Sequence, residues 1–345
     1  MPPTRTEISQ LGEFGLIDRI SGYFKNQNES TLLGIGDDSA IIEAGEKNIL
    51  LSTDLLIEGI HFDLSYAPLK HLGYKAIAVN VSDIAAMNGI PQQATVSIGL
   101  SNRFSVEAVD ELYEGIKLAC KSFKVDLVGG DTSSSPAGLI LSVSVTGSVS
   151  PGSVTRRSTA RLKDVICATG DLGGAYIGLQ VLEREKQEFL VNPEMQPKLE
   201  GYDYIVQRQL KPEARMDIIY EFSELGVIPT SMIDVSDGIA SDLMHICYQS
   251  GLGANIYEDK LPIDKLTYDT AVEFKLDPIT CVLNGGEDYE LLFTINQDDH
   301  KKVKDHPDIH FIGYTQEKDK GLNLITKQQN VVPLSAQGWE HFRSS

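Results

Sequence analysis

Residues 68–91 read PLKHLGYKAIAVNVSDIAAMNGIP, and this stretch decides the fold because it predicts a long helix. Pro68 suits the first turn of a helix, while Gly89 and Pro91 supply the stop. The apolar side chains between them recur at helical spacing, at Leu72, Ala76, Val79, Ile84 and Met87. The same helix would present Asn80 and Asp83, one turn apart, on one face.

Short segments rich in leucine and β-branched residues flank that helix. KNILLST at 47–53 and QATVSIGL at 93–100 have the length and composition of strands. A second helix is predicted over 105–123, followed by a strand at 125–129 and a longer alternating strand from 139. Strands and helices therefore mix along the chain, which predicts an α+β (mixed α/β) fold class.

A change in composition divides the chain. The segment 150–164, SPGSVTRRSTARLKD, is polar and basic and contains proline and glycine, as is typical of a boundary between folding units. We therefore predict domains at 1–150 and 151–345, consistent with about 150 residues per domain. The second part is predicted to contain a strand at DVICAT, a helix after Gly170, an acidic proline-bearing insertion at 185–200, two helices across 201–225 and a strand at SMIDVS, 231–236.

Composition excludes several classes of protein. The 345 residues carry a net charge of -19, which disfavours a nucleic acid or an anionic membrane as partner. The chain is 41% hydrophobic, so it is expected to fold. Its four cysteines are too widely spaced for a zinc or redox motif, and neither a signal pattern nor a membrane-length apolar run is present. We expect a cytoplasmic protein with reduced thiols.

Acidic residues recur after strands and glycines. Each one alone could cap a helix or close a turn, but several such sites in apolar segments without lysines would need cations if they converged. Oxygen ligands without histidine or cysteine favour magnesium. The acids are Asp37 and Asp38 in GIGDDSA, Asp54 in STDLLIEG, Asp83 in NVSDIAAM, Asp131 in GGDTSS, Asp234 and Asp237 in IDVSDG, and Glu287 and Asp288 in GGEDYEL.

Magnesium held by carboxylates usually serves to handle substrate phosphates, so a nucleotide enzyme follows as a hypothesis. The chain has no GxxxxGK[ST] loop, no HRD loop and no GxGxxG opening a helix. Neither common plan for ATP binding therefore applies. The double glycines at 129–130 and 285–286 would still permit close backbone approach to a phosphate.

Nine motifs in order resemble those of the thiamine-monophosphate kinase family, within the superfamily built like aminoimidazole ribonucleotide synthetase. The resemblance covers nearly the whole chain. The motifs are LGEFGLI, GIGDDSA, STDLLIEGIHF, YKAIAVNVSDIAAM, GGDT, TGDLGGA, IDVSDG, GGEDYEL and GWEHF.

The resemblance implies ATP-dependent phosphorylation of thiamine monophosphate to thiamine diphosphate. It also implies a homodimer that pairs through N-terminal sheet domains, each with a C-terminal α/β domain that completes the active site. Magnesium ligands carried over residue by residue are Asp38, Ser52, Thr53, Asp54, Asp83, Asp131, Asp234 and Asp237. The residues that the resemblance implies for ATP binding are Tyr113, Gly130, Asp131, Arg157 and Ser236. Those that it implies for thiamine binding are His61, Glu287 and Trp339.

The acceptor in such a reaction is a phosphate oxygen that is largely ionised near neutral pH, so no general base is expected. Catalysis would then consist of positioning and charge neutralisation. The residues expected to supply it are Asp54, Asp83, Asp131 and Arg157.

Two departures from the family pattern bear on the site. AAMNGI has Asn88 where family members commonly have glycine, and the doubled Arg156 and Arg157 leave open which one faces the phosphates. Two other functions also stay open: another ATP-using enzyme of the superfamily, such as a purine-biosynthetic cyclo-ligase, and a non-catalytic acidic protein that binds divalent ions.

Overall fold

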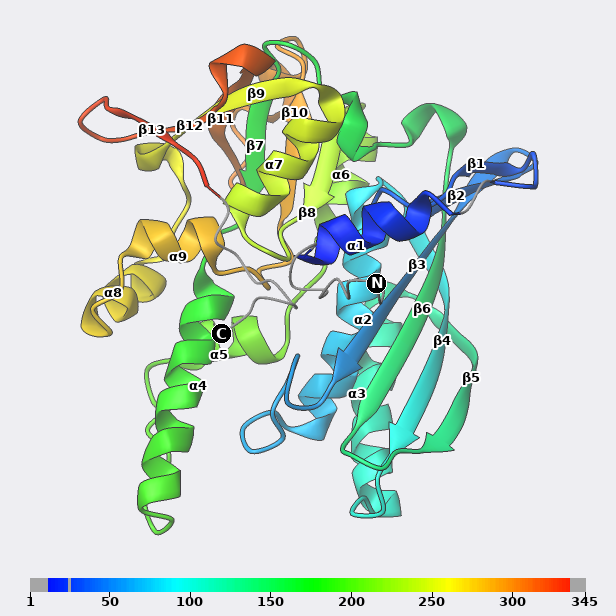
Figure 1. Ribbon diagram of the computed structural model, residues 1–345, viewed down its shortest axis with the longest axis vertical. Helices are drawn as coiled ribbons and strands as arrows, with labels where there is room; N and C mark the ends of the chain where they lie inside the picture. Colours follow the sequence, from blue (N-terminus) through cyan, green and yellow to red (C-terminus); the bar gives the residue numbers. More distant parts are fainter. Residues whose placement is uncertain (1–11, 24–25, 336–345) are drawn as a thin grey trace, which may run out of the picture.

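The computed structural model describes residues 12–23 and 26–335, in which two β-sheets pack around a central helix (Figure 1). The strands of the first sheet are β1 Thr31–Leu33, β2 Ala40–Ala44, β3 Lys47–Ile57, β4 Ile90–Leu100, β5 Asp126–Ser134 and β6 Ile140–Val149. Those of the second are β7 Val165–Thr169, β8 Ser231–Asp234, β9 Leu252–Tyr257, β10 Leu291–Ile295, β11 Ile309–Glu317, β12 Leu322–Ile325 and β13 Val331–Pro333. Their orders are β1-β2-β3-β6-β4-β5 and β13-β12-β9-β11-β7-β10-β8.

The described helices belong mostly to the second half of the chain. They are α1 Gly12–Ser21, α2 Leu69–Ala86, α3 Val106–Phe123, α4 Gly174–Val191, α5 Asp203–Leu210, α6 Met216–Leu225, α7 Ile239–Ser250, α8 Lys265–Glu273, α9 Pro278–Asn284 and α10 His300–Val303. Short 3₁₀ turns include η2 Pro151–Ser153, η3 Arg157–Thr159, η4 Glu258–Lys260 and η5 Lys318–Lys320. None of the described helices is long and apolar enough to cross a membrane.

Helix α2 is the centre of the molecule. Fourteen of its 18 residues are buried, including the polar Asn80 and Ser82, so it is covered on nearly all sides. One continuous core cluster extends from the first sheet through α2 to α6 and one face of the second sheet. The helix that the sequence predicted therefore joins the two halves of the chain.

Helices α2 and α3 pack at close backbone distance. A β-carbon on Gly115 would lie 1.9 Å from the carbonyl oxygen of Lys70, and one on Gly73 would lie 2.0 Å from that of Leu112. Only glycine fits at these two positions. The close contact holds α2 firmly against the layer formed by α3 (Figure 1).

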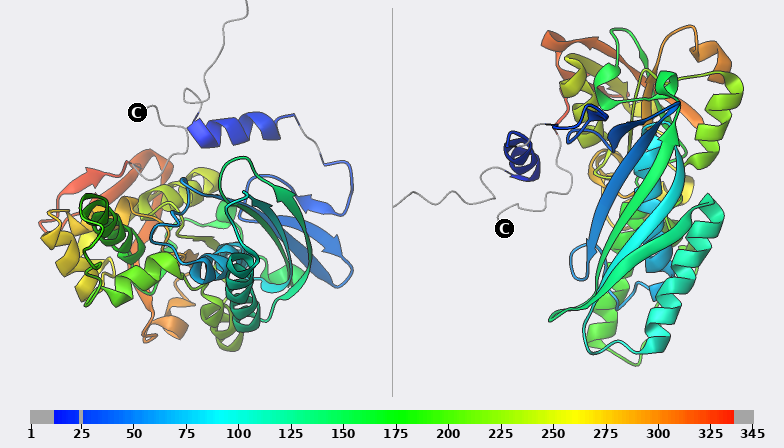
Figure 2. Two further views of the ribbon diagram at one scale, coloured as in Figure 1. Left: turned by 90° about the horizontal axis from the view of Figure 1, so that it is seen from below. Right: turned by 90° about the vertical axis from the view of Figure 1, so that its right-hand side faces the viewer.

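The two faces of the first sheet differ. Along β3, Leu50 and Ser52 are buried against the helices, whereas Leu51 and Leu55 on the other face are 40% and 50% exposed. The right-hand view of Figure 2 shows β3, β6 and β4 with no helix in front of them. All nine residues of the edge strand β5 are exposed. One face of this sheet is therefore uncovered in the single chain.

The mixed α/β class is confirmed, although several elements are longer than predicted. The strands predicted at 47–53 and 125–129 continue to Ile57 and Ser134, because their later residues pair with β6 and β4. The insertion predicted at 185–200 is helical up to Val191, because no glycine or proline interrupts α4 before Pro193.

The turn after α2 is retained without glycine. Asn88 adopts a left-handed φ of 59°, a conformation that asparagine tolerates better than most side chains. The division between domains at 150 and 151 stays a prediction.

Candidate active site

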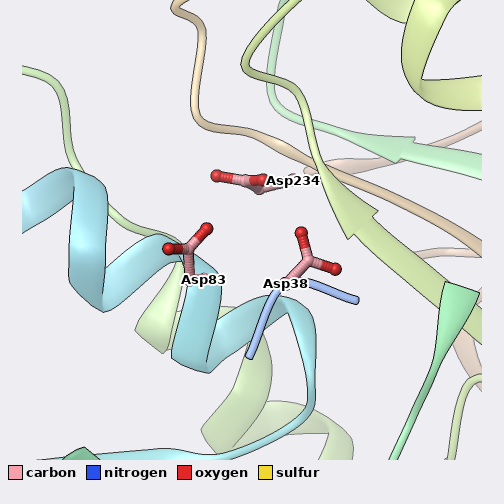
Figure 3. Close-up of side chains that lie close together, drawn as sticks. All are labelled: Asp38, Asp83 and Asp234. Atoms are coloured by element: carbon pink, nitrogen blue, oxygen red, sulfur yellow. The ribbon is translucent and has the colours of Figure 1, made fainter. Parts of the chain in front are cut away.

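Three aspartates from distant parts of the chain converge beside α2 (Figure 3). Asp38 lies in the loop between β1 and β2, Asp83 lies on α2, and Asp234 ends β8. One carboxylate oxygen from each lies within 4.8 Å of the others. Both halves of the chain therefore contribute to one acidic cluster.

Burial makes this cluster electrostatically unfavourable without a cation. Burial and the neighbouring Asp38 carboxylate raise the pKa of Asp54 to about 6 and that of Asp234 to about 7. Burial, followed by repulsion from Asp54 and Asp234, raises the pKa of Asp83 well above 3.8. The three clustered carboxylates and the neighbouring Asp54, with no histidine or cysteine among them, suit a hard divalent ion such as magnesium.

Hydroxyl groups and one arginine orient the carboxylates. Ser82 Oγ donates to Asp234 Oδ2 at 2.6 Å, and Ser52 Oγ donates to Asp83. Arg157 Nε donates to Asp38 Oδ2 at 3.0 Å. The structure thus brings Arg157, rather than Arg156, to the acidic cluster.

The cluster opens into a cleft of about 820 Å³ between α2, the end of β3, α4 and α9. Its wall includes the predicted site residues His61, Ser236, Asp237 and Glu287 together with Asp54, Asp83 and Asp234. His61 Nδ1 accepts a hydrogen bond from the backbone N–H of Ile57 at 3.0 Å. A ligand in the cleft can therefore reach both these acids and the side chains of His61 and Glu287.

The acids of GGEDYEL have separate environments. Asp288 accepts hydrogen bonds from the backbone N–H of Gly173 at 2.7 Å, at the start of α4. Glu290 accepts from Arg208 Nη1 at 2.8 Å and from Arg215 Nη1 at 2.7 Å. Of these acids, only Glu287 lines the cleft. Asp288 and Glu290 instead bind groups of the protein itself and therefore have structural roles.

Four predicted site residues do not reach the cluster within one chain. Thr53 lies between Ser52 and Asp54 on β3 and so faces the uncovered side of the sheet, where Ser144 donates to it. Asp131 is exposed on β5, and it faces the same side because it pairs with Ser97 of β4.

Gly130 and Tyr113, which were predicted to contact the nucleotide, also lie outside the cleft. Gly130 packs so closely on β4 that a β-carbon would lie 1.9 Å from the carbonyl oxygen of Val96, which gives it a structural reason to be glycine. Tyr113 lies half-buried on α3 and packs against the core. Trp339 lies outside the described residues.

Three further residues belong to the site: Asp37, which the sequence singled out as an acid but not as a ligand, and Lys75 and Gln209, which it did not single out. The Asp37 side chain is 3% exposed, and burial followed by the Asp38 carboxylate raises its pKa to about 7. Lys75 and Gln209 are buried and line the cleft. The spacing could have revealed Lys75, because it precedes Asp83 by eight residues and therefore shares a helix face with it.

Comparison with known proteins identifies the family. Models for AIR synthase related proteins match residues 36–149 for the N-terminal domain and 164–321 for the C-terminal domain. The thiamine-monophosphate kinase of Aquifex aeolicus is 36% identical over 97% of this chain and 99% of its own, and that of Bacillus subtilis is 33% identical over 96% and 100%.

A solved structure described as AaThiL complexed with AMPPCP and TMP covers 98% of this chain and 99% of its own, with 32% identity and a TM-score of 0.83. A thiamine-monophosphate kinase structure from Stenotrophomonas maltophilia covers 91% and 96%, with 31% identity and a TM-score of 0.70. The chain therefore belongs to the thiamine-monophosphate kinase family and has its two-domain AIR synthase related fold.

Proposed function

We propose that this protein is a kinase that transfers the γ-phosphoryl group of ATP to thiamine monophosphate and releases thiamine diphosphate. The observation that carries this proposal is the acidic cluster beside a cleft that is also lined by His61 and Glu287. The full-length similarity to a structure complexed with AMPPCP, an ATP analogue, and TMP supports it.

The acidic cluster fits magnesium, which would be held by carboxylate and hydroxyl oxygens. Bound there, it would supply charge neutralisation between two phosphate-bearing ligands. Within one chain we expect it to be held by Asp38, Ser52, Asp54, Asp83, Asp234 and Asp237; the close grouping of Asp38, Asp83 and Asp234 supports this. The raised pKa values of Asp54 and Asp234 support this assignment, because a nearby divalent charge would compensate their repulsion.

The chain's own residues would position the reactants rather than transfer protons. The acceptor oxygen of a phosphate monoester is largely ionised above about pH 6, so no side chain needs to remove a proton. Arg157 and Ser236 would contact the nucleotide phosphates, and the guanidinium of Arg157, whose Nε and Nη2 donate to Asp38, would offer a phosphate oxygen its remaining N–H groups. His61, Glu287 and Trp339 would contact the thiamine moiety.

We further propose a cytoplasmic homodimer that forms through the uncovered face of the first sheet. Support comes from the exposed Leu51 and Leu55 on that face, and from Val128 on the edge strand, which is 61% exposed. Such pairing would carry Thr53 and Asp131, which face the uncovered side, toward the partner copy, where they could complete its site. Light scattering coupled to gel filtration should then give twice the mass of one chain.

The proposed reaction is tested by measuring ADP release in the presence of magnesium. Thiamine monophosphate should stimulate release strongly, while aminoimidazole precursors should not. Stimulation by those precursors alone would favour the cyclo-ligase alternative. Absence of ADP release with either acceptor would favour the non-catalytic, ion-binding alternative.

A further inference from the structure

We propose that Lys75 and Gln209 are positioning residues, which hold the Glu287 carboxylate so that it selects an acceptor substrate carrying an amino-substituted ring. The inference rests on the proposed function, since thiamine monophosphate contains an aminopyrimidine. It concerns how the site distinguishes this ring from rings of similar shape.

Lys75 is 4% exposed although it carries a charge, and its partners account for this burial. Its Nζ lies 2.9 Å from Glu287 Oε1 and 3.0 Å from Oε2. It also lies 3.3 Å from the backbone carbonyl oxygen of Gln209. An ammonium group has three N–H donors, and these three acceptors can use all of them. Lys75 is therefore occupied with Glu287 and Gln209 rather than available to a phosphate.

Gln209 holds the same carboxylate from a second helix. Its side chain lies on α5 and is 6% exposed, and Nε2 donates to Glu287 Oε2 at 2.6 Å. Because a carboxylate only accepts, the amide must present its NH₂ group to Glu287. Glu287 itself has a left-handed φ of 58°, which is unusual for a glutamate. Helices α2 and α5 thus fix a residue whose backbone conformation would otherwise be unfavourable.

The remaining side of Glu287 faces the cleft. Its side chain is 29% exposed, and the residue lines the cleft. A carboxylate held in this way offers acceptors and no donor. An amino group on a ligand ring could donate to it, whereas an oxo group at the same position would present an acceptor to an acceptor. Such a site rejects the wrong group more strongly than it attracts the right one.

The test compares two acceptors: thiamine monophosphate and oxythiamine monophosphate, in which an oxo group replaces the amino group. ADP formation by the wild-type enzyme should show a kcat/KM at least ~100-fold higher for the amino compound. Lys75→Met should raise the KM for thiamine monophosphate by ~10-fold or more, leave the KM for ATP unchanged and reduce the preference by ~10-fold. Lys70→Met, on the exposed side of the same helix, is the matched control and should behave as wild type.

A double variant separates positioning from direct contact. If Lys75 works through Glu287, Lys75→Met/Glu287→Gln should have the same kcat/KM as Glu287→Gln alone, within about 2-fold. Losses that multiply would overturn the proposal, because they would show that Lys75 acts on the substrate independently. Should Lys75→Met fail to fold, Gln209→Leu provides the same comparison, with the exposed Gln207→Leu as its control.

The outcomes for the wild type distinguish the two proposals. Equal use of both acceptors would overturn this inference and leave the kinase function intact. Phosphorylation of neither acceptor would overturn the proposed function, and this inference with it.

Discussion

Removing one carboxylate from the acidic cluster should stabilise the metal-free protein at high pH. Asp234 is 2% exposed, and burial together with Asp38 raises its pKa to about 7. A carboxyl group with a raised pKa binds its proton more tightly in the folded chain than in the unfolded chain. Its charge therefore costs no stability below about pH 4, and its cost is complete only above about pH 7.

The size of this cost follows from the two pKa values. A pKa of about 7 in the folded chain against an ordinary 3.8 corresponds to on the order of 4 kcal/mol at pH 8. Asp38 and Asp54 share this repulsion and can adjust when one charge is removed, so we expect Asp234→Asn to gain about 2 kcal/mol. The asparagine oxygen can still accept the hydrogen bond from Ser82.

Urea unfolding with EDTA, at pH 4.5 and at pH 8, measures this gain. The variant should be more stable than wild type at pH 8 and nearly equal to it at pH 4.5. Millimolar magnesium should reverse the order at pH 8, because an ion bound to the folded state stabilises the wild type more. Asp259→Asn, on the exposed turn η4, serves as the control. A variant that is less stable than wild type at both pH values would refute the reasoning, since the Ser82 contact would then outweigh the repulsion.

Three further outcomes are expected. Asp83→Asn should lower turnover by at least ~100-fold at saturating magnesium while the circular dichroism spectrum is unchanged, and near-normal turnover would exclude it as a ligand. Incubation with γ-labelled ATP and magnesium without acceptor should leave the protein unlabelled, whereas a stable covalent label would contradict direct transfer. Gly115→Ala should cost about 3 kcal/mol or more in chemical unfolding, because its β-carbon would meet the Lys70 carbonyl at 1.9 Å; a cost below about 1 kcal/mol would show that α2 and α3 can separate easily.

The sequence predicted the parts of the site that depend on local pattern. Asp83 follows from helical spacing on α2, and Asp234 from its position at the end of a strand. The convergence of Asp38, Asp83 and Asp234 is present in the structure. Local pattern could not reveal which face of β5 carries Asp131, because that depends on its register with β4.

Long-range pairing explains what the sequence did not reveal. Lys75 shares a helix face with Asp83, but local pattern cannot show that its partner is Glu287, which is 212 positions away. The role of Gln209 likewise depends on the placement of α5 beside α2. The family resemblance supplied residues that are expected to contact ligands, but not the residues that hold them in position.

The connection between the two sheets is tied down through Arg157, although its composition is that of a linker. The backbone N–H of Arg157 donates to Asp37 at 3.2 Å, its side chain binds Asp38, and its carbonyl oxygen accepts from Ser231 at 2.8 Å and Ser250 at 3.0 Å. A protease must extract several residues of backbone to cut a chain. Trypsin should therefore spare the Arg157–Ser158 bond in the native protein, and the two halves would not come apart as independently mobile fragments.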